Sequence, residues 1–339
     1  MRVVCMSDQE ENPERRIDFG QSTRRIFLSL NRLFAIGLLS LICATNAVAQ
    51  KTETAKSLLP EPKDAAVRAR ERQALIEFYE ALGGPDWIER EFWGSDRPVG
   101  EWHGVTTNAE GYVVQLTIYD NNVTGPLSPA ICQLEHLHTL HLSFNKLSGA
   151  LPDKLGECRE LKNLWLKGNK ITGRLPDPVA ALPNLEYLDV HANEMSGALP
   201  AIWNTPKLKI FRADDNHISG ALPAQLLRQP LLEHVFLHNN ELTGTIPNTL
   251  SPNLSILMLA NNKLSGPVPE ELGKLKKLTD LRLNRNQLSG PIPASFTDAT
   301  SLQVLRLDHN QLVGPIPTGL AKRLMVFDAS NNPGVVPAQ

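Results

Sequence analysis

The stretch that decides the fold runs from Leu278 to Pro293 and reads LTDLRLNRNQLSGPIP. The same pattern of leucines, one asparagine, one glycine and a final proline recurs at residues 137–152, 161–176 and 302–317. The asparagines mark a repeat of 22 to 24 residues, as in 145 − 121 = 24 and 262 − 240 = 22. They are Asn121, Asn145, Asn169, Asn193, Asn216, Asn240, Asn262, Asn286, Asn310 and Asn332. A period of this length is typical of a solenoid, in which each repeat forms one coil.

In the first half of each repeat, leucines alternate with other residues, as at Leu281 and Leu283. A period of two predicts a short β-strand whose leucines share one face. One strand cannot bury that face alone, so we expect neighbouring coils to stack and bury the leucines in a continuous core. Each buried large aliphatic side chain contributes roughly 1.5–3 kcal/mol to that stack.

The residues that follow the strand suit a turn. An asparagine amide carries donors and acceptors, so we expect the asparagines from Asn121 to Asn310 to form a structural ladder that satisfies the turn backbone. Removing one would leave buried polar groups unpaired, at a cost of about 1–3 kcal/mol. The glycine, Gly290 in the quoted copy, permits a positive φ. The proline then directs the chain into the outer connection.

The string L-x-x-L-x-L-x-x-N-x-L-x-G-x-I-P, which covers residues 116–332, resembles the plant-specific class of leucine-rich repeats. That class forms the ectodomains of plant receptor-like kinases and the polygalacturonase-inhibiting proteins. The resemblance implies an α/β repeat solenoid, a right-handed leucine-rich-repeat horseshoe with parallel β-strands on its concave face and an N-terminal helical cap. It implies less about function, because the same scaffold presents many different surfaces.

The segment before the repeats also has a family likeness. EFYEALGGPDW (Glu77–Trp87) and EWHGVTTNAEGYVVQL (Glu101–Leu116) resemble the N-terminal cap of these proteins, and of bacterial and algal exported repeat proteins. Plant caps usually carry C-x-W-x-G-V-x-C, whereas Gly100 and Thr107 stand at the two cysteine positions here. This departure favours a bacterial exported relative over a plant receptor.

Within the cap, residues 65–82 predict a helix with one apolar face, formed by Leu75, Phe78, Tyr79 and Leu82. The following GGPD sequence ends that helix. Three tryptophans come next, at positions 87, 93 and 102. They could serve as a ligand site, but the first coil of a solenoid needs a cover over its open core. We therefore favour a capping role.

Residues 1–49 are predicted to be an export signal peptide. Basic residues precede the apolar run LFAIGLLSLICA (Leu33–Ala44), and Ala47-Val48-Ala49 supplies a small-residue cleavage site. Arg24-Arg25 resembles a twin-arginine signal, so export can follow either the general secretory or the twin-arginine route. The alternative to cleavage is that this segment stays in place as an uncleaved N-terminal anchor. We expect a flexible lead-in at 50–64, the cap at 65–115, about ten coils at 116–334 and a tail at 335–339.

Composition narrows the function classes. The formal net charge is −2, from 34 basic and 36 acidic residues, which argues against a nucleic-acid partner. The apolar run at Leu33–Ala44 is short for a membrane span, so no transmembrane helix is expected in the mature chain. The export signal predicts that the mature chain is periplasmic, attached to the cell surface or secreted. Of the four cysteines, Cys132 and Cys158 lie outside the leader. We expect these two cysteines to be buried free thiols in the outer layer. A disulfide between their coils is the alternative.

Residues beside the strand leucines are expected to face the concave surface. Exposed aromatic rings among charged and imidazole groups suit a protein or polysaccharide ligand. An ordinary solvated strand surface is the alternative. The predicted ligand-binding residues are Tyr119, His141, Trp165, Lys167, Tyr187, Asp189, His191, Arg212, Asp214, Phe236, His238, Arg282 and Arg306.

Catalytic and metal sites are not predicted. His191, Asp214 and His238 occupy successive rungs of one column, but a flat row converges poorly on a tetrahedral ion. No nucleophile motif or phosphate-binding loop accompanies them, and no cofactor is expected. The sequence therefore predicts an exported, non-enzymatic binding protein that uses its concave face. The alternative is a structural or adhesion protein of the cell envelope that uses its lateral or convex faces.

Overall fold

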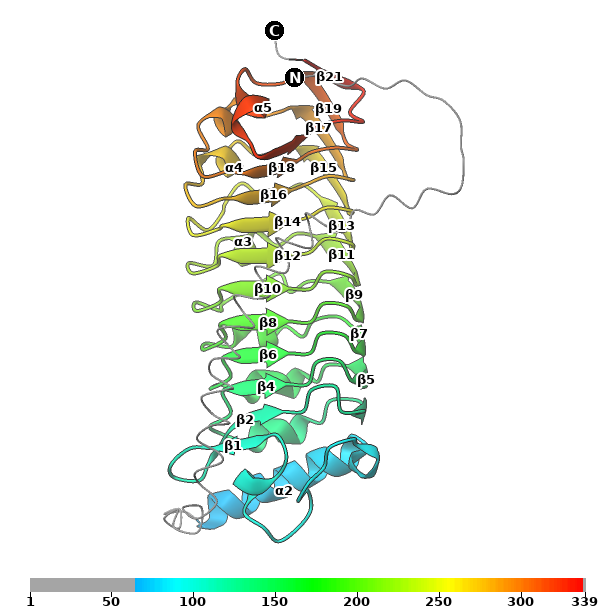
Figure 1. Ribbon diagram of the computed structural model, residues 1–339, viewed down its shortest axis with the longest axis vertical. Helices are drawn as coiled ribbons and strands as arrows, with labels where there is room; N and C mark the ends of the chain where they lie inside the picture. The colour runs from blue at the N-terminus through cyan, green and yellow to red at the C-terminus, as the bar shows by residue number, and fades with distance from the viewer. Residues whose placement is uncertain (1–64, 338–339) are drawn as a thin grey trace, which may run out of the picture. The chain divides into compact units, whose positions relative to one another are not determined.

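The computed structural model describes residues 65–337, which lie in one compact unit that begins at Glu61. The predicted signal peptide, the lead-in, Cys5 and Cys43 fall outside the described residues. The described chain winds into stacked coils, each with a strand on one face, a second strand on an adjoining face and an outer connection (Figure 1). It is an α/β repeat solenoid.

An eleven-stranded sheet forms the concave face. Successive coils pair in parallel and in register, so that Leu140 lies beside Leu164 and Leu164 beside Leu188, all with 0% exposure. The first strand pairs antiparallel with the second and belongs to the cap. The strands are β1 (Val105–Thr107), β2 (Val113–Thr117), β4 (Thr139–His141), β6 (Asn163–Trp165), β8 (Tyr187–Asp189), β10 (Ile210–Arg212), β12 (His234–Phe236), β14 (Ile256–Met258), β16 (Asp280–Arg282), β18 (Val304–Arg306) and β20 (Val326–Asp328).

A second, ten-stranded sheet runs along the adjoining side of the coils and is not predicted from the sequence (Figure 1). It forms because the residues after each asparagine are extended and pair in parallel with the next coil. Gly149 lies at φ 72° within it, which accounts for the recurring glycine. The strands are β3 (Thr124–Gly125), β5 (Lys146–Ala150), β7 (Lys170–Gly173), β9 (Glu194–Ala198), β11 (His217–Ala221), β13 (Glu241–Gly244), β15 (Lys263–Pro267), β17 (Gln287–Pro291), β19 (Gln311–Pro315) and β21 (Gly334–Val336).

Short helices carry the chain across the outer side of most coils (Figure 1). Several start directly after the recurring proline, as η5 does after Pro152, since proline cannot donate to a sheet ladder. The single-turn elements are the 3-10 helices η4 (Pro129–Gln133), η5 (Asp153–Glu157), η6 (Val179–Ala181) and η7 (Ala294–Thr297), and the α-helices α3 (Ala224–Leu227), α4 (Glu271–Lys274) and α5 (Leu320–Arg323).

The N-terminal cap covers the first coil. Its helix α2 (Ala65–Ala81) buries Leu75 and Phe78 completely, and two 3-10 helices follow it, η2 (Gly84–Asp86) and η3 (Val99–Glu101). The rings of Trp87 and Trp93 lie 5.1 Å apart, as do those of Trp93 and Trp102. All three tryptophans are buried, at 1%, 8% and 1% exposure respectively. Their burial makes them part of the cap core, where no ligand reaches their faces.

The buried asparagines join one coil to the next. Asn169 donates from Nδ2 to the carbonyl oxygens of Leu142 and Leu166, at 3.0 and 2.9 Å. Its Oδ1 accepts a hydrogen bond from the backbone N–H of Leu147, in the preceding coil, at 2.9 Å. The residue before most of these asparagines has a positive φ, such as 57° at Phe144 and 54° at Asp215. This left-handed residue turns the chain out of the concave strand.

Candidate binding surface on the concave sheet

The thirteen predicted ligand-binding residues all lie on the concave strands or in the turns that directly follow them. Several end their strands and pair in register with the next coil, as Trp165 does with His141 on one side and Asp189 on the other. Others come two residues later, as Lys167 does. Because the register is continuous, these side chains form two columns that cross the coils, except for Tyr187, which begins β8 and lies beside them.

The first coils hold an aromatic cluster, which we define as Tyr119, His141, Phe144, Trp165 and Lys167. The Tyr119 ring lies 5.4 Å from both His141 and Phe144, and the His141 ring lies 4.9 Å from Trp165. The Lys167 ammonium sits 4.7 Å from the centre of the Phe144 ring. Tyr119 and Phe144 are 50% and 42% exposed. The cluster therefore presents two exposed aromatic rings, and the rings of His141 and Trp165 beside them are half-buried.

The middle coils differ from the sequence-based expectation of an exposed aromatic band. Trp165, Tyr187 and Phe236 are half-buried, because side chains of adjacent coils pack against one another at the strand spacing. His191 and Asp214 are buried, at 7% and 2% exposure. These two residues form part of the sheet's own polar network and present little surface to a partner.

Polar contacts link neighbouring columns. His191 Nδ1 lies 2.5 Å from Asp189 Oδ1, within one strand end. The Arg212 guanidinium stacks 4.9 Å from the Phe236 ring centre and donates to Asp214 Oδ2 at 3.4 Å. Further along, Arg282 is held by Asp280 at 2.9 Å, and Arg306 lies 3.9 Å from Asp328. The guanidinium groups on this face are thus pre-oriented by carboxylates.

Burial controls the charge of the concave histidines. The pKa of His141 is lowered to about 4, mainly by desolvation; the Asp189 carboxylate opposes this shift, and the Lys167 ammonium adds to it. Desolvation also lowers the pKa of His234 and of His238, the latter against the opposing charge of Asp214. At neutral pH these imidazoles are therefore uncharged.

Sequence reasoning missed Phe144, which is more exposed than Trp165. Phe144 occupies the left-handed position just before the asparagine, so it falls outside the alternation of the strand, although its ring contacts Tyr119 and Lys167. The period-two pattern used for the prediction does not extend to that position. The sequence signal was a large aromatic residue at a position that in the other repeats holds Asp, Asn, Gly, Ala, Arg or His.

Models of known families match the repeat region. A leucine-rich-repeat model covers residues 252–312, and a second one covers residues 136–158, 160–182 and 231–252. The solenoid is built from leucine-rich repeats. No curated protein matches the chain in a sequence comparison.

Solved structures with leucine-rich repeats share this architecture. The ectodomain of the Arabidopsis receptor kinase HAESA, solved with a peptide hormone ligand, is 28% identical with a TM-score of 0.67, over 78% of this chain and 46% of that chain. A leucine-rich-repeat protein of Leptospira interrogans is 31% identical (TM-score 0.52, 62% and 53%). A plant ice-binding protein is 26% identical (TM-score 0.59, 78% and 86%). The chain thus spans less than half of the HAESA ectodomain chain.

The two cysteines of the repeat region form a disulfide, so the prediction of free thiols is wrong. Cys132 lies in η4 and Cys158 directly follows η5, and coil stacking brings their Cα atoms to 4.7 Å. That separation falls within the range of about 4.4–6.8 Å that a disulfide requires. The outer connections of adjacent leucine-rich repeats are therefore covalently joined next to the cap.

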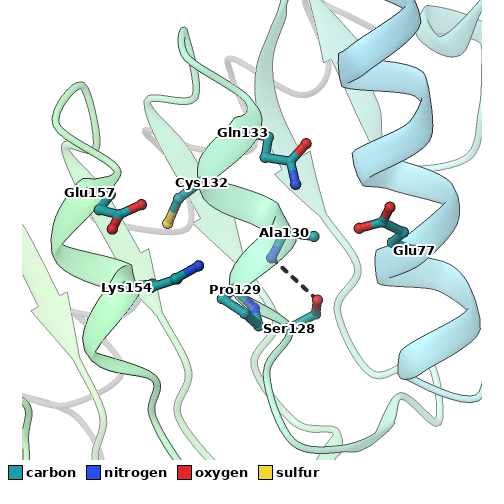
Figure 2. A pocket seen from close by; sticks show the side chains of 8 residues that line it. All are labelled: Glu77, Ser128, Pro129, Ala130, Cys132, Gln133, Lys154 and Glu157. Carbon is teal, nitrogen blue, oxygen red and sulfur yellow. Dashed lines mark hydrogen bonds between the residues drawn. The ribbon is translucent and has the colours of Figure 1, made fainter.

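A cavity of about 230 Å³ lies beside this disulfide, between α2 and the first two outer helices (Figure 2). Glu77, Gln133, Lys154 and Glu157 are among the residues that line it. Ser128 Oγ accepts a hydrogen bond from the Ala130 N–H at 3.3 Å, which caps the start of η4. The cavity is thus a polar hollow on the helical side, and it shares no residue with the aromatic cluster.

Across residues 65–337, none of the helices combines the length and the apolar character needed to cross a bilayer.

Proposed function

We propose that this protein is an exported recognition protein that binds a protein or peptide partner through its concave surface. The observation that carries the proposal is the pair of exposed rings, Tyr119 at 50% and Phe144 at 42%, side by side on one face. Exposed aromatic side chains of this size are the residues that contribute most at protein interfaces, since they bury a large area at little entropic cost.

The surroundings of these rings support a protein or peptide partner. Interfaces usually combine an aromatic centre with a polar rim. Here Lys167 supplies a charge within the aromatic cluster, against the Phe144 ring, and the coils beyond it carry the pre-oriented Arg212 and Arg282. The HAESA ectodomain, which has the same architecture, binds a peptide hormone. By analogy, an extended peptide laid across the coils would meet the aromatic cluster first and the charged columns next.

Export is supported by the covalent link between Cys132 and Cys158. Disulfides form and persist in oxidising compartments and are rare in reducing ones. The similar HAESA structure is an ectodomain, which is the part of a receptor that lies outside the cell membrane. Binding is favoured over catalysis because the tight Asp189–His191 pair is largely buried, with His191 at 7% exposure.

The proposal is tested by capture of a partner from the host's secreted and envelope fractions. The wild-type protein is compared with a Tyr119→Ser, Phe144→Ser double variant, which removes exposed rings and should change stability little. The matched control is Ile202→Ser, because Ile202 is 73% exposed and lies in the connection between β9 and β10.

A partner held by the wild type and by Ile202→Ser, and lost by the double variant, is the expected result. A partner held equally by all three folded proteins would refute concave recognition and would favour an envelope scaffold that uses another face. The Trp165→Ala, Phe236→Ala pair should weaken binding less, because both rings are half-buried.

A further inference from the structure

A cluster of potential metal ligands lies midway along the concave surface, outside the aromatic cluster. Asp214, Asp215 and His238 each offer one ligand atom, and these atoms lie within 4.8 Å of one another. The two aspartates follow β10, and His238 follows β12 in the next coil. The sequence pattern suggested His191 as a neighbour, but the structure pairs His191 with Asp189.

The strongest feature of this cluster is the buried carboxylate of Asp214, which is only 2% exposed. Its Oδ2 lies 3.4 Å from an Arg212 nitrogen and 3.5 Å from His238 Nε2, which are weak contacts. Its Oδ1 is enclosed and accepts no hydrogen bond from any residue of the described range, and His238 Nδ1 is likewise enclosed and unbonded there. Buried polar atoms are normally paired, so the unpaired Asp214 Oδ1, on the carboxylate that His238 Nε2 approaches, points to a missing ligand.

The second carboxylate is brought to the cluster by the turn. Asp215 occupies the left-handed position, at φ 54°, so its side chain leaves the strand columns and remains exposed. Asn239 donates from Nδ2 to Asp215 Oδ1 at 2.6 Å and fixes the orientation of that carboxylate. Such outer partners are typical of metal ligands, which they orient. The cluster therefore combines a buried acid, an oriented exposed acid and an imidazole.

We propose that Asp214, Asp215 and His238 bind a divalent first-row transition ion such as Zn²⁺. Two carboxylate oxygens and one imidazole nitrogen match the ligands of Zn²⁺ and its neighbours, whereas Ca²⁺ and Mg²⁺ prefer oxygen ligands alone. Three protein ligands leave coordination positions open. Since Asp215 is exposed, those positions are available to a carboxylate or imidazole of a bound partner.

The chain provides a matched control four coils away from Asp214. Asp308 is also buried, at 6% exposure, and its Oδ2 lies 3.0 Å from His309 Nδ1. Its Oδ1, like that of Asp214, accepts no hydrogen bond within the described residues. This pair has an aspartate and a histidine on the same surface, but no second acidic residue converges on it within the described residues. A site that needs all three ligands should therefore form at Asp214 and not at Asp308.

The test is a calorimetric titration of Zn²⁺ into the metal-free protein, followed by Co²⁺ absorption to report ligation. The wild type should bind one equivalent. Asp214→Asn and His238→Gln should each weaken binding at least tenfold, and His309→Gln should leave it unchanged. Circular dichroism checks that the variants fold. Asp215→Asn, at an exposed position, replaces Asp214→Asn if the latter does not fold.

Failure of the wild type to bind Zn²⁺ or Co²⁺ below millimolar concentration would overturn the proposal. So would an affinity that His238→Gln and Asp215→Asn leave unaltered, or one that falls equally in His309→Gln. The titration uses the ion alone, so its outcome is independent of the partner proposed for the aromatic cluster.

Discussion

Replacement of Asn169 by alanine tests what holds the coils together. Asn169 is 8% exposed, and its Oδ1 is the acceptor for the Leu147 N–H of the preceding coil. Alanine leaves that buried N–H unpaired, at about 1–3 kcal/mol. The two carbonyls that lose Nδ2 keep a second partner, because Asn145 also bonds to Leu142 and Asn193 to Leu166. Losing the two hydrogen bonds that Nδ2 donates adds about 0.5–1.5 kcal/mol each, so we expect a total destabilisation of roughly 2–6 kcal/mol.

The assay is urea unfolding followed by circular dichroism, in which the midpoint should fall without a change in slope. Asn184→Ala is the control, because its two inter-coil hydrogen bonds are solvent-exposed: Nδ2 donates to the Arg159 carbonyl at 3.0 Å, and Oδ1 accepts from Lys207 Nζ at 2.7 Å. Their loss should cost less than about 0.5 kcal/mol. If the two variants lose equal stability, or if Asn169→Ala is unaffected, the reasoning from buried amide pairing is refuted.

Two further predictions concern the cap and the outer face. Burial raises the pKa of Glu71 from 4.5 to about 7, although its bond from the Val113 N–H opposes the shift. The folded state therefore holds a proton that the unfolded chain has released, so the free energy of unfolding should fall between pH 4.5 and 7. Glu71→Gln should flatten that fall and raise the melting temperature at pH 8; an unchanged profile would contradict it. The disulfide joins cysteines that are 26 residues apart. Its removal in the Cys132→Ser, Cys158→Ser double variant should lower the free energy of unfolding by about 3 kcal/mol, measured by chemical denaturation. Equal stability with and without a reductant in the wild type would count against this estimate.

The core and the concave strands could be predicted from the sequence because burial imposes a strict period. Leucines such as Leu164 and Leu188 must recur on one face, and each one that does so is fully buried. The concave columns follow from the same alternation, so Trp165 and Arg212 were placed on the correct face. Their exposure was not predictable, since it depends on the size of the side chains in adjacent coils.

Features that depend on stacking across coils or on the turn could not be predicted. The lateral sheet arises only when extended segments such as β5 meet their copies in neighbouring coils. The Cys132–Cys158 bridge depends on the alignment of two outer helices that are 26 residues apart in sequence. Phe144 and Asp215 were missed because a left-handed backbone carries their side chains away from the alternation of the strand.

The measurement that tests concave recognition most directly is side-chain oxidation by hydroxyl radicals, mapped by mass spectrometry with and without the captured partner. Tyr119 and Phe144 should be oxidised in the free protein and protected in the complex. Met325, which is 75% exposed and directly precedes β20, should be oxidised equally in both. Protection of Met325 or of lateral-sheet residues, with Tyr119 and Phe144 still reactive, would contradict binding through the aromatic cluster.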